Sequence, residues 1–124
     1  MANVVVWADI PVIDLERARK FYAHLLDTPV EDMPGLPGVA ILKSPGATEP
    51  MDVSADLAVG PIMPSTSHGT TIYLSSQGDI DGMLARAMEA EGSVLSEKQL
   101  MADIGWIAFI KDSEGNRIGI HQPK

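Results

Sequence analysis

The chain has 124 residues, of which 45% are hydrophobic and 21% charged, a composition typical of one compact soluble domain that excludes a disordered chain. Its net charge of −8 at pH 7 argues against binding to nucleic acid or to anionic membranes. Cysteine is absent, which excludes disulfides, thiolate metal sites and a cysteine nucleophile. The N-terminal residues show no signal-peptide pattern and no apolar run reaches a membrane span, so we expect a cytoplasmic protein.

The first half of the chain is predicted to form a strand, a helix and three further strands. Residues 3–10 are apolar and β-branched, which indicates a strand that Pro11 is expected to stop. Residues 14–26 carry apolar side chains at helical spacing, and Asp14 is expected to cap this helix by accepting from the free amides of its first turn. Three short strands are then expected within residues 29–33, 38–44 and 54–60.

The second half repeats this plan. A strand is expected within 70–76, followed by a helix over 79–92 that Asp79 caps and Gly92 closes. The last two strands are expected to be joined by a hairpin turn in which Gly115 takes a positive φ. The three closing strands are predicted within residues 93–99, 105–112 and 116–122.

The spacing of the two capping residues indicates an internal duplication. Asp14 and Asp79 are 65 residues apart, and each opens a helix just after a strand. Because one strand, one helix and three strands could not bury a core alone, we expect the two copies to fold together as one domain. The expected modules are residues 1–62 and 70–124, with a linker at 63–69.

This order resembles the vicinal oxygen chelate superfamily, which includes glyoxalase I, bleomycin-resistance proteins and extradiol dioxygenases. The resemblance rests on three stretches: "IPVIDLERARKFYAHLL", "GTTIYLSSQGDIDGMLARAMEAEGSVL" and "DIGWIAFIKDSEGNRIGIHQ". It implies an α+β fold in which tandem βαβββ modules form an open barrel of curved sheets around a small-molecule ligand. It also implies a homodimer.

The resemblance further implies where a metal would bind, namely to His or Glu side chains on the first and last strand of each module. Those positions fall on Trp7, on Thr71 or Ile72, on Gly119, and within residues 55–60, which offer no His or Glu. Strand parity favours Thr71 over Ile72. Because these residues are poor ligands for a divalent cation, we expect no metal cofactor and doubt the metal-dependent chemistry of the family.

The two-residue repeat of a strand predicts which side chains line the cavity. Gly119 is expected to leave space for a ligand or for the indole of Trp7. Each residue also has a plainer interpretation: Trp7 as packing, Tyr73 as core, Asp9 as an acceptor for backbone amides, Arg117 as a partner of surface carboxylates, and His121 as a solvated side chain. The predicted ligand-binding residues are Trp7, Asp9, Thr71, Tyr73, Arg117, Gly119 and His121.

Three functional hypotheses follow. The first is a metal-free protein that binds a small, partly aromatic molecule. The second is a lyase, isomerase or dioxygenase-type enzyme of the same superfamily with a relocated site, in which Asp9 and His121 form a general acid–base pair or half of a metal site. The third is a diverged protein whose cavity is filled by Trp7 and which acts through dimerisation. The sequence does not identify the ligand.

Overall fold

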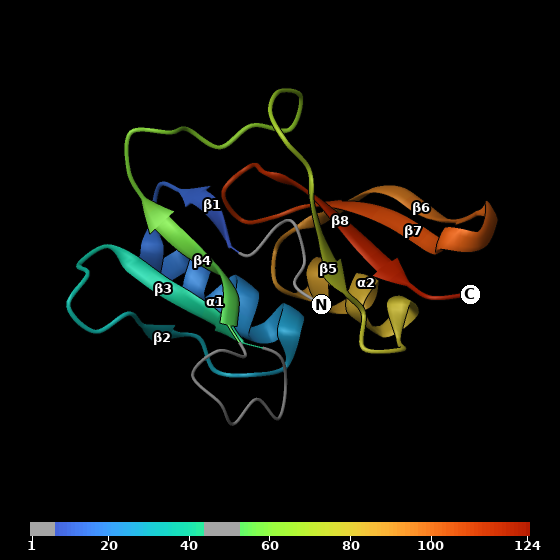
Figure 1. The fold of residues 1–124 in the computed structure, drawn as a ribbon, viewed down its shortest axis with the longest axis horizontal. Helices are drawn as coiled ribbons and strands as arrows, with labels where there is room; N and C mark the ends of the chain where they lie inside the picture. Colours follow the sequence, from blue (N-terminus) through green and yellow to red (C-terminus); the bar gives the residue numbers. More distant parts are fainter. Residues whose placement is uncertain (1–6, 44–52) are drawn as a thin grey trace. The chain divides into compact units, whose positions relative to one another are not determined.

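A computed structural model describes residues 7–43 and 53–124 (Figure 1). Residues 3–6 of the first expected strand and residue 44 of the third lie outside the described residues. The chain divides into two compact units, Met1–Pro64 and Ser65–Lys124. This division falls within the stretch 63–69 that was expected to link the modules.

The first unit contains one helix and one four-stranded sheet. The strand order is β1-β4-β3-β2, in which β1 and β4 run parallel and the other neighbours run antiparallel. The elements are β1 (Ala8–Val12), α1 (Leu15–Leu26), β2 (Glu31–Asp32), β3 (Val39–Lys43) and β4 (Val53–Val59).

Helix α1 begins and ends as its local chemistry predicts. The Asp14 side chain accepts a hydrogen bond of 3.1 Å from the amide of Arg17, and Asp27 ends the helix in the left-handed conformation with φ of 52°. The buried stripe of α1 packs on one face of the sheet, which we call the helix face. The buried residues of α1 are Ala18, Phe21, Tyr22 and Leu25, and those of the helix face are Ile10, Val12, Ala40, Leu42, Ala55 and Leu57.

The prediction that Pro11 stops the first strand is wrong. Strand β1 continues through Pro11, which lies opposite Ala58 of β4, and ends at Val12. β1 is an edge strand with β4 on only one side, and an edge strand tolerates proline because half of its backbone groups have no neighbouring strand to bond.

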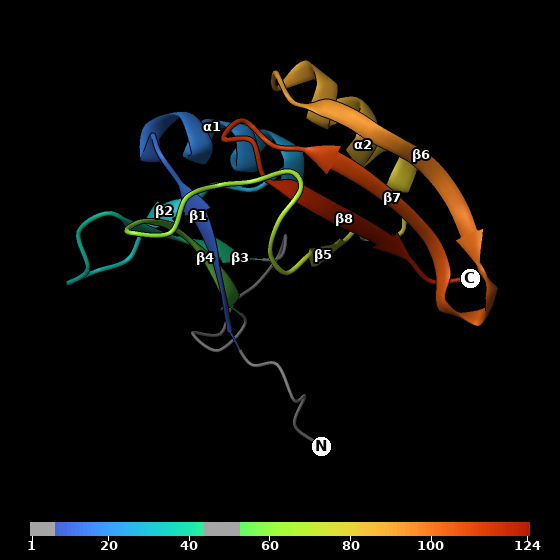
Figure 2. The ribbon, with the colours of Figure 1, turned by 90° about the horizontal axis from the view of Figure 1, so that it is seen from above.

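The second unit repeats the architecture, with the strand order β5-β8-β7-β6 and a parallel pair formed by β5 and β8. Figure 2 shows β6 and β7 curving together as a long antiparallel pair. The helix face of this sheet is buried under α2. The elements are β5 (Ile72–Ser75), α2 (Ile80–Glu89), β6 (Ser93–Met101), the 3₁₀ turn η1 (Ala102–Ile104), β7 (Gly105–Lys111) and β8 (Arg117–Gln122).

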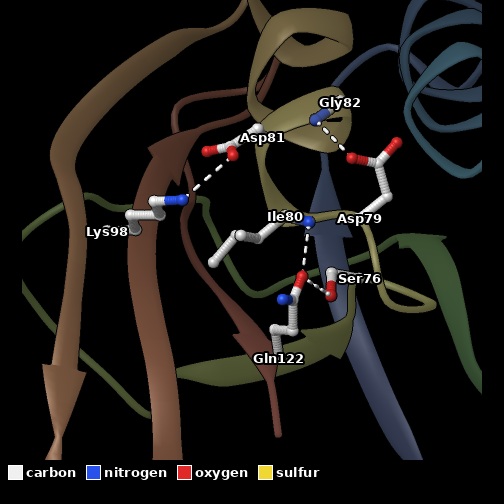
Figure 3. A network of polar contacts seen from close by, with 7 residues as sticks. All are labelled: Ser76, Asp79, Ile80, Asp81, Gly82, Lys98 and Gln122. Carbon is white, nitrogen blue, oxygen red and sulfur yellow. Dashed lines mark hydrogen bonds and ion pairs between the residues drawn. The ribbon is translucent and has the colours of Figure 1, made fainter. Parts of the chain in front are cut away.

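The start of α2 is fastened to the end of the last strand (Figure 3). Asp79 caps the helix by accepting from the amide of Gly82 at 3.0 Å. The Gln122 side-chain oxygen accepts from the amide of Ile80 at 2.8 Å and from the Ser76 hydroxyl at 3.4 Å. These bonds satisfy amides that the first helical turn leaves free, so the C-terminal strand and α2 hold each other in place.

The other end of α2 differs in detail from the prediction. The left-handed residue after the helix is Glu91, with φ of 72°, and not Gly92. Gly92 is the second residue after the C-cap residue Ala90, and its amide donates to the carbonyl of Ala87 at 2.8 Å. This hydrogen bond is the one that defines a Schellman motif. On the exposed side, Lys98 of β6 forms an ion pair of 2.9 Å with Asp81 (Figure 3).

The hairpin between β7 and β8 is organised by one buried carboxylate. Asp112 accepts from the amides of Glu114 and Asn116 at 2.9 and 2.8 Å, and from the Asn116 side-chain amide at 2.9 Å. Gly115 takes the predicted positive φ, of 93°. The prediction of this turn is confirmed.

The expected α+β fold of two βαβββ modules is confirmed. Within the described residues the two sheets share no strand pairing and are not closed into a barrel. In the same part of the chain, no helix has both the length and the apolar character that crossing a membrane requires.

Candidate functional site

The second unit carries an apolar pocket of about 660 Å³ on the face of its sheet opposite α2. Alternation along β7 and β8 produces this face, because Ala108, Ile118 and Ile120 are buried on the helix face and their neighbours point the other way. Size and apolar character match those of small-molecule sites. The pocket is lined by Tyr73, Leu74, Ser75, Ser96, Gln99, Met101, Ile104, Ile107, Phe109 and His121.

Two aromatic rings and a guanidinium form a stack along this face. Tyr73 and Phe109 meet edge to face with centroids 5.8 Å apart. The guanidinium carbon of Arg117 lies 3.8 Å from the centroid of the Phe109 ring, which is a cation–π contact. Tyr73 remains 51% exposed, so its ring is a wall of the pocket and not part of the core.

Gly119 lies directly under the Tyr73 ring, its partner in the register of β5 and β8. A Cβ atom added at Gly119 would overlap the ring atoms of Tyr73. In the structure a side chain from the neighbouring strand, that of Tyr73, occupies the space that was expected to admit a ligand or the Trp7 indole. The glycine leaves room for the Tyr73 ring over β8 and so shapes the pocket wall indirectly.

Arg117 and Thr71 meet on the same face. Arg117 donates from Nη1 to the Thr71 hydroxyl at 2.9 Å. Ile72 instead pairs with Ile118, which is buried on the helix face. Thr71 therefore lies on the side of the sheet opposite α2, as strand parity predicted, although neither Thr71 nor Arg117 is among the residues that line the pocket. Arg117 contacts Thr71 and Phe109 in place of the surface carboxylates that were expected.

His121 is held by a backbone contact at the pocket edge. Its Nε2 atom lies 2.8 Å from the carbonyl oxygen of Ile104, and because a carbonyl only accepts, Nε2 carries the proton. In the neutral ring Nδ1 is then the acceptor. His121 is not the freely solvated side chain that its place near the chain end suggests.

In the first unit, the predicted site residues Trp7 and Asp9 lie beside Asp56, which the sequence analysis did not identify. The Trp7 indole donates from Nε1 to Oδ2 of Asp56 at 3.1 Å. Asp9 lies opposite Asp56 in the register of β1 and β4. Asp56 is only 6% exposed. Its burial, a hydrogen bond with Asp9 and the charge of Asp9 together raise the pKa of Asp56 to about 6, although the hydrogen bond from Trp7 acts in the opposite direction.

Asp56 occupies the position of the repeat that corresponds to Gly119. With Trp7 equivalent to Thr71, Asp9 corresponds to Tyr73, and the parallel registers then match Asp56 with Gly119. Residues 55–60 contain no His or Glu, and the sequence analysis therefore did not identify Asp56. A lone carboxylate in an otherwise apolar strand was the signal that could have found it.

The residues at the metal positions of the family do not fit a metal. Trp7, Thr71 and Gly119 provide no ligand atom of the kind a divalent ion prefers, which leaves Asp56 as the one carboxylate among the four positions. Within residues 7–43 and 53–124, no group of three or more His, Asp or Glu side chains is placed to hold a metal ion.

The structure divides the seven predicted site residues between the units. Five of them share the face of the second sheet opposite α2, while Trp7 and Asp9 lie on the first unit. Their role in binding stays a prediction. The five are Thr71, Tyr73, Arg117, Gly119 and His121.

The chain belongs to the Glyoxalase/Bleomycin resistance protein/Dioxygenase superfamily, whose family model matches residues 4–120. Among solved structures it is similar to a glyoxalase/bleomycin resistance protein from Albidiferax ferrireducens, with 19% identity and a TM-score of 0.73 over 98% of this chain and 100% of the other. It is also similar to TnmS3, an antibiotic binding protein from Streptomyces, with 28% identity and a TM-score of 0.66 over 100% and 99% of the two chains.

The chain is also similar in sequence to a mycobacterial protein whose name refers to glyoxylase activity. The protein "Putative glyoxylase CFP32" of Mycobacterium tuberculosis is 26% identical over 120 residues, which cover 94% of this chain. The chain spans 44% of the length of that relative.

Proposed function

We propose that this protein binds a small, partly aromatic molecule in the pocket of its second unit, without the divalent metal that many members of the superfamily use. The observation that carries the proposal is the pocket of about 660 Å³ between the rings of Tyr73 and Phe109 and the aliphatic side chains of Met101, Ile104 and Ile107. Flat aromatic ligands suit such a wall, because aromatic pairs add about 0.5–1.5 kcal/mol beyond area burial.

Polar groups at the pocket can orient the ligand. Ser75, Ser96 and Gln99 offer hydroxyl and amide groups, and Nδ1 of neutral His121 is an acceptor. The similarity to an antibiotic binding protein supports a binding role for this chain. The expected ligand is therefore mainly apolar, with one or two donor groups.

Binding is tested with 8-anilinonaphthalene-1-sulfonate as an aromatic probe. Ser96→Phe places a ring inside the pocket and should abolish the probe's fluorescence increase, whereas Leu95→Phe adds a ring at a position outside the pocket lining and should leave it intact. Equal binding by both variants would contradict the proposed site. Mass spectrometry of small molecules extracted from the wild-type protein then identifies the natural ligand.

The absence of a metal requirement is tested by elemental analysis of protein purified without chelator. The expected result is no divalent ion near one per chain. A stoichiometric metal whose removal abolishes binding would overturn this part of the proposal.

The second candidate is an enzyme of the same superfamily that uses acid–base chemistry. The fixed tautomer of His121 at the pocket favours it, as does the name of the mycobacterial relative. Long incubation of the natural ligand with the protein, followed by mass spectrometry of the ligand, distinguishes a binding protein from an enzyme. A mass change that wild type produces and His121→Ala does not would establish an enzyme; recovery of unchanged ligand supports a binding protein.

A further inference from the structure

A polar cluster lies on the sheet of the first unit. Asp9 and Asp56 face each other across β1 and β4, on the side of the sheet opposite α1. One oxygen of Asp56 accepts from the indole of Trp7. The other, Oδ1, is buried and has no donor among the described residues unless the two carboxyl groups of Asp9 and Asp56 share a proton. A buried acceptor without a donor is costly, by about 1–3 kcal/mol, and is uncommon in native structures.

A proton, a water molecule or a cationic N–H group could satisfy this oxygen. With the pKa of Asp56 raised to about 6, the shared proton is mostly absent at neutral pH. The pair then carries two negative charges in close proximity, and like charges in a partly desolvated site favour a bound cation.

Among the described residues of the first unit, the neighbours of the pair on β3 and β2 do not neutralise it. On β3 the residue opposite Asp56 is the apolar Ile41. Lys43 and Glu31, which follow on the same face of β3 and β2, form an ion pair with each other at 3.9 Å. Beside the pair, Trp7 is 40% exposed and presents an aromatic surface on which a flat cation can stack.

We propose that Asp9, Asp56 and Trp7 form a binding site for a ligand group that carries an N–H cation, such as an amidinium or a primary ammonium. The cation donates one N–H to Oδ1 of Asp56 and a second to the carboxylate of Asp9, while its flat part contacts the indole. The site takes a different chemistry from the apolar pocket of the second unit, and it does not depend on the function proposed there.

The test uses benzamidine, a flat aromatic cation, and benzamide, its neutral analogue of the same shape. The Trp7 indole N–H resonance reports the site, and Trp106→Phe assigns it because the chain has only two tryptophans. At pH 7.5 benzamidine should shift this resonance saturably and benzamide should not. Lowering the pH to 5.0 should weaken binding about tenfold, because one pH unit below the pKa of about 6 leaves roughly one-tenth of Asp56 ionised.

Matched variants isolate the charges. Asp56→Asn retains an acceptor for Trp7 and a polar group toward Asp9, so it should fold while it weakens benzamidine binding at least about tenfold. Asp9→Asn, at an exposed position, should do the same. Asp103→Asn removes the same charge from an exposed residue of the second unit and should have no effect. Undiminished binding in the Asp9 and Asp56 variants, an equal response to benzamide, or a proton as the only detectable occupant would overturn the proposal.

Discussion

At the scale of single residues, one close contact in the second unit joins a residue without a side chain to one with a large side chain. Gly119 and Tyr73 are register partners, and the ring fills the volume that a Cβ at position 119 would need. The glycine therefore serves the conformation of its neighbour. Its effect on binding comes through the position of the Tyr73 ring.

A double-mutant cycle tests this dependence. Gly119→Ala should lower the free energy of unfolding by about 1–3 kcal/mol, as overpacking does, because the ring must leave its contact with Phe109. In a Tyr73→Ala background the same substitution should cost little or increase stability, since alanine suits a strand better than glycine. Urea denaturation of the four proteins measures the coupling, and additive costs would show that the ring does not limit position 119.

Asp56 is the residue whose protonation should appear in the stability of the whole protein. Its pKa is about 6 in the folded state, above the ordinary value of 3.8 for this side chain, so the folded state binds the proton more tightly. Stability should therefore rise as pH falls from about 6 towards 4, and fall again as pH rises through this range.

Asp56→Asn imitates the protonated side chain and should remove this dependence. The variant should be more stable than wild type at pH 7.5, by up to about 3 kcal/mol from the size of the pKa shift, and equally stable near pH 3.5. Urea denaturation across this range measures the difference, with Asp103→Asn as a control for net charge. A difference that stays constant with pH would refute the assignment.

At the scale of elements, the β7–β8 hairpin depends on one side chain more than on its turn sequence. Asp112 is 2% exposed and accepts three hydrogen bonds within the turn. Asp112→Ala leaves two buried amides without an acceptor, at about 1–3 kcal/mol each. We expect a loss of several kcal/mol in thermal or urea denaturation, whereas Ser113→Ala in the same turn should cost less than about 1 kcal/mol. Similar losses in both would show that Asp112 is not the organiser of the turn.

The elements that the sequence predicted well are those whose boundaries depend on neighbours in the chain. Asp14 and Asp79 cap their helices through the amide three residues on, and Gly115 turns within its own hairpin. Contacts between strands explain the failures. Pro11 is tolerated because of where β1 lies in its sheet, and the space at Gly119 is filled from β5.

The candidate sites show the same limit. Alternation within each strand correctly placed Thr71 with Tyr73 on one face, and likewise Gly119 with His121, since that period is local. The pairing of Asp9 with Asp56 depends on a parallel register between strands 47 residues apart, which no short pattern contains. The pocket lining from β6 and η1 was missed for a similar reason.

At the scale of the whole molecule, the sheet edges favour self-association. β6 is an edge strand of the second sheet and carries exposed apolar side chains, Leu95 at 47% and Leu100 at 46%. Exposed edges and apolar side chains of this kind are often covered by another chain. We predict that the protein is a homodimer.

Sedimentation equilibrium at tens of micromolar protein checks the dimer. If β6 takes part, Leu100→Lys should shift the protein towards monomer, and Leu36→Lys, at an exposed apolar residue of the first unit, should not. A monomeric wild type would contradict the prediction.

The correspondence between Asp56 and Gly119 bears on how the two halves of this chain can change over evolutionary time. Both halves keep the same strand order, yet one has at this position a side chain that accepts from Trp7, and the other has no room for a side chain there. Copying either residue into the other half, as gene conversion between repeats would do, removes the acceptor of Trp7 or displaces Tyr73. The halves are therefore no longer interchangeable, and mutational libraries of this protein should vary each half separately.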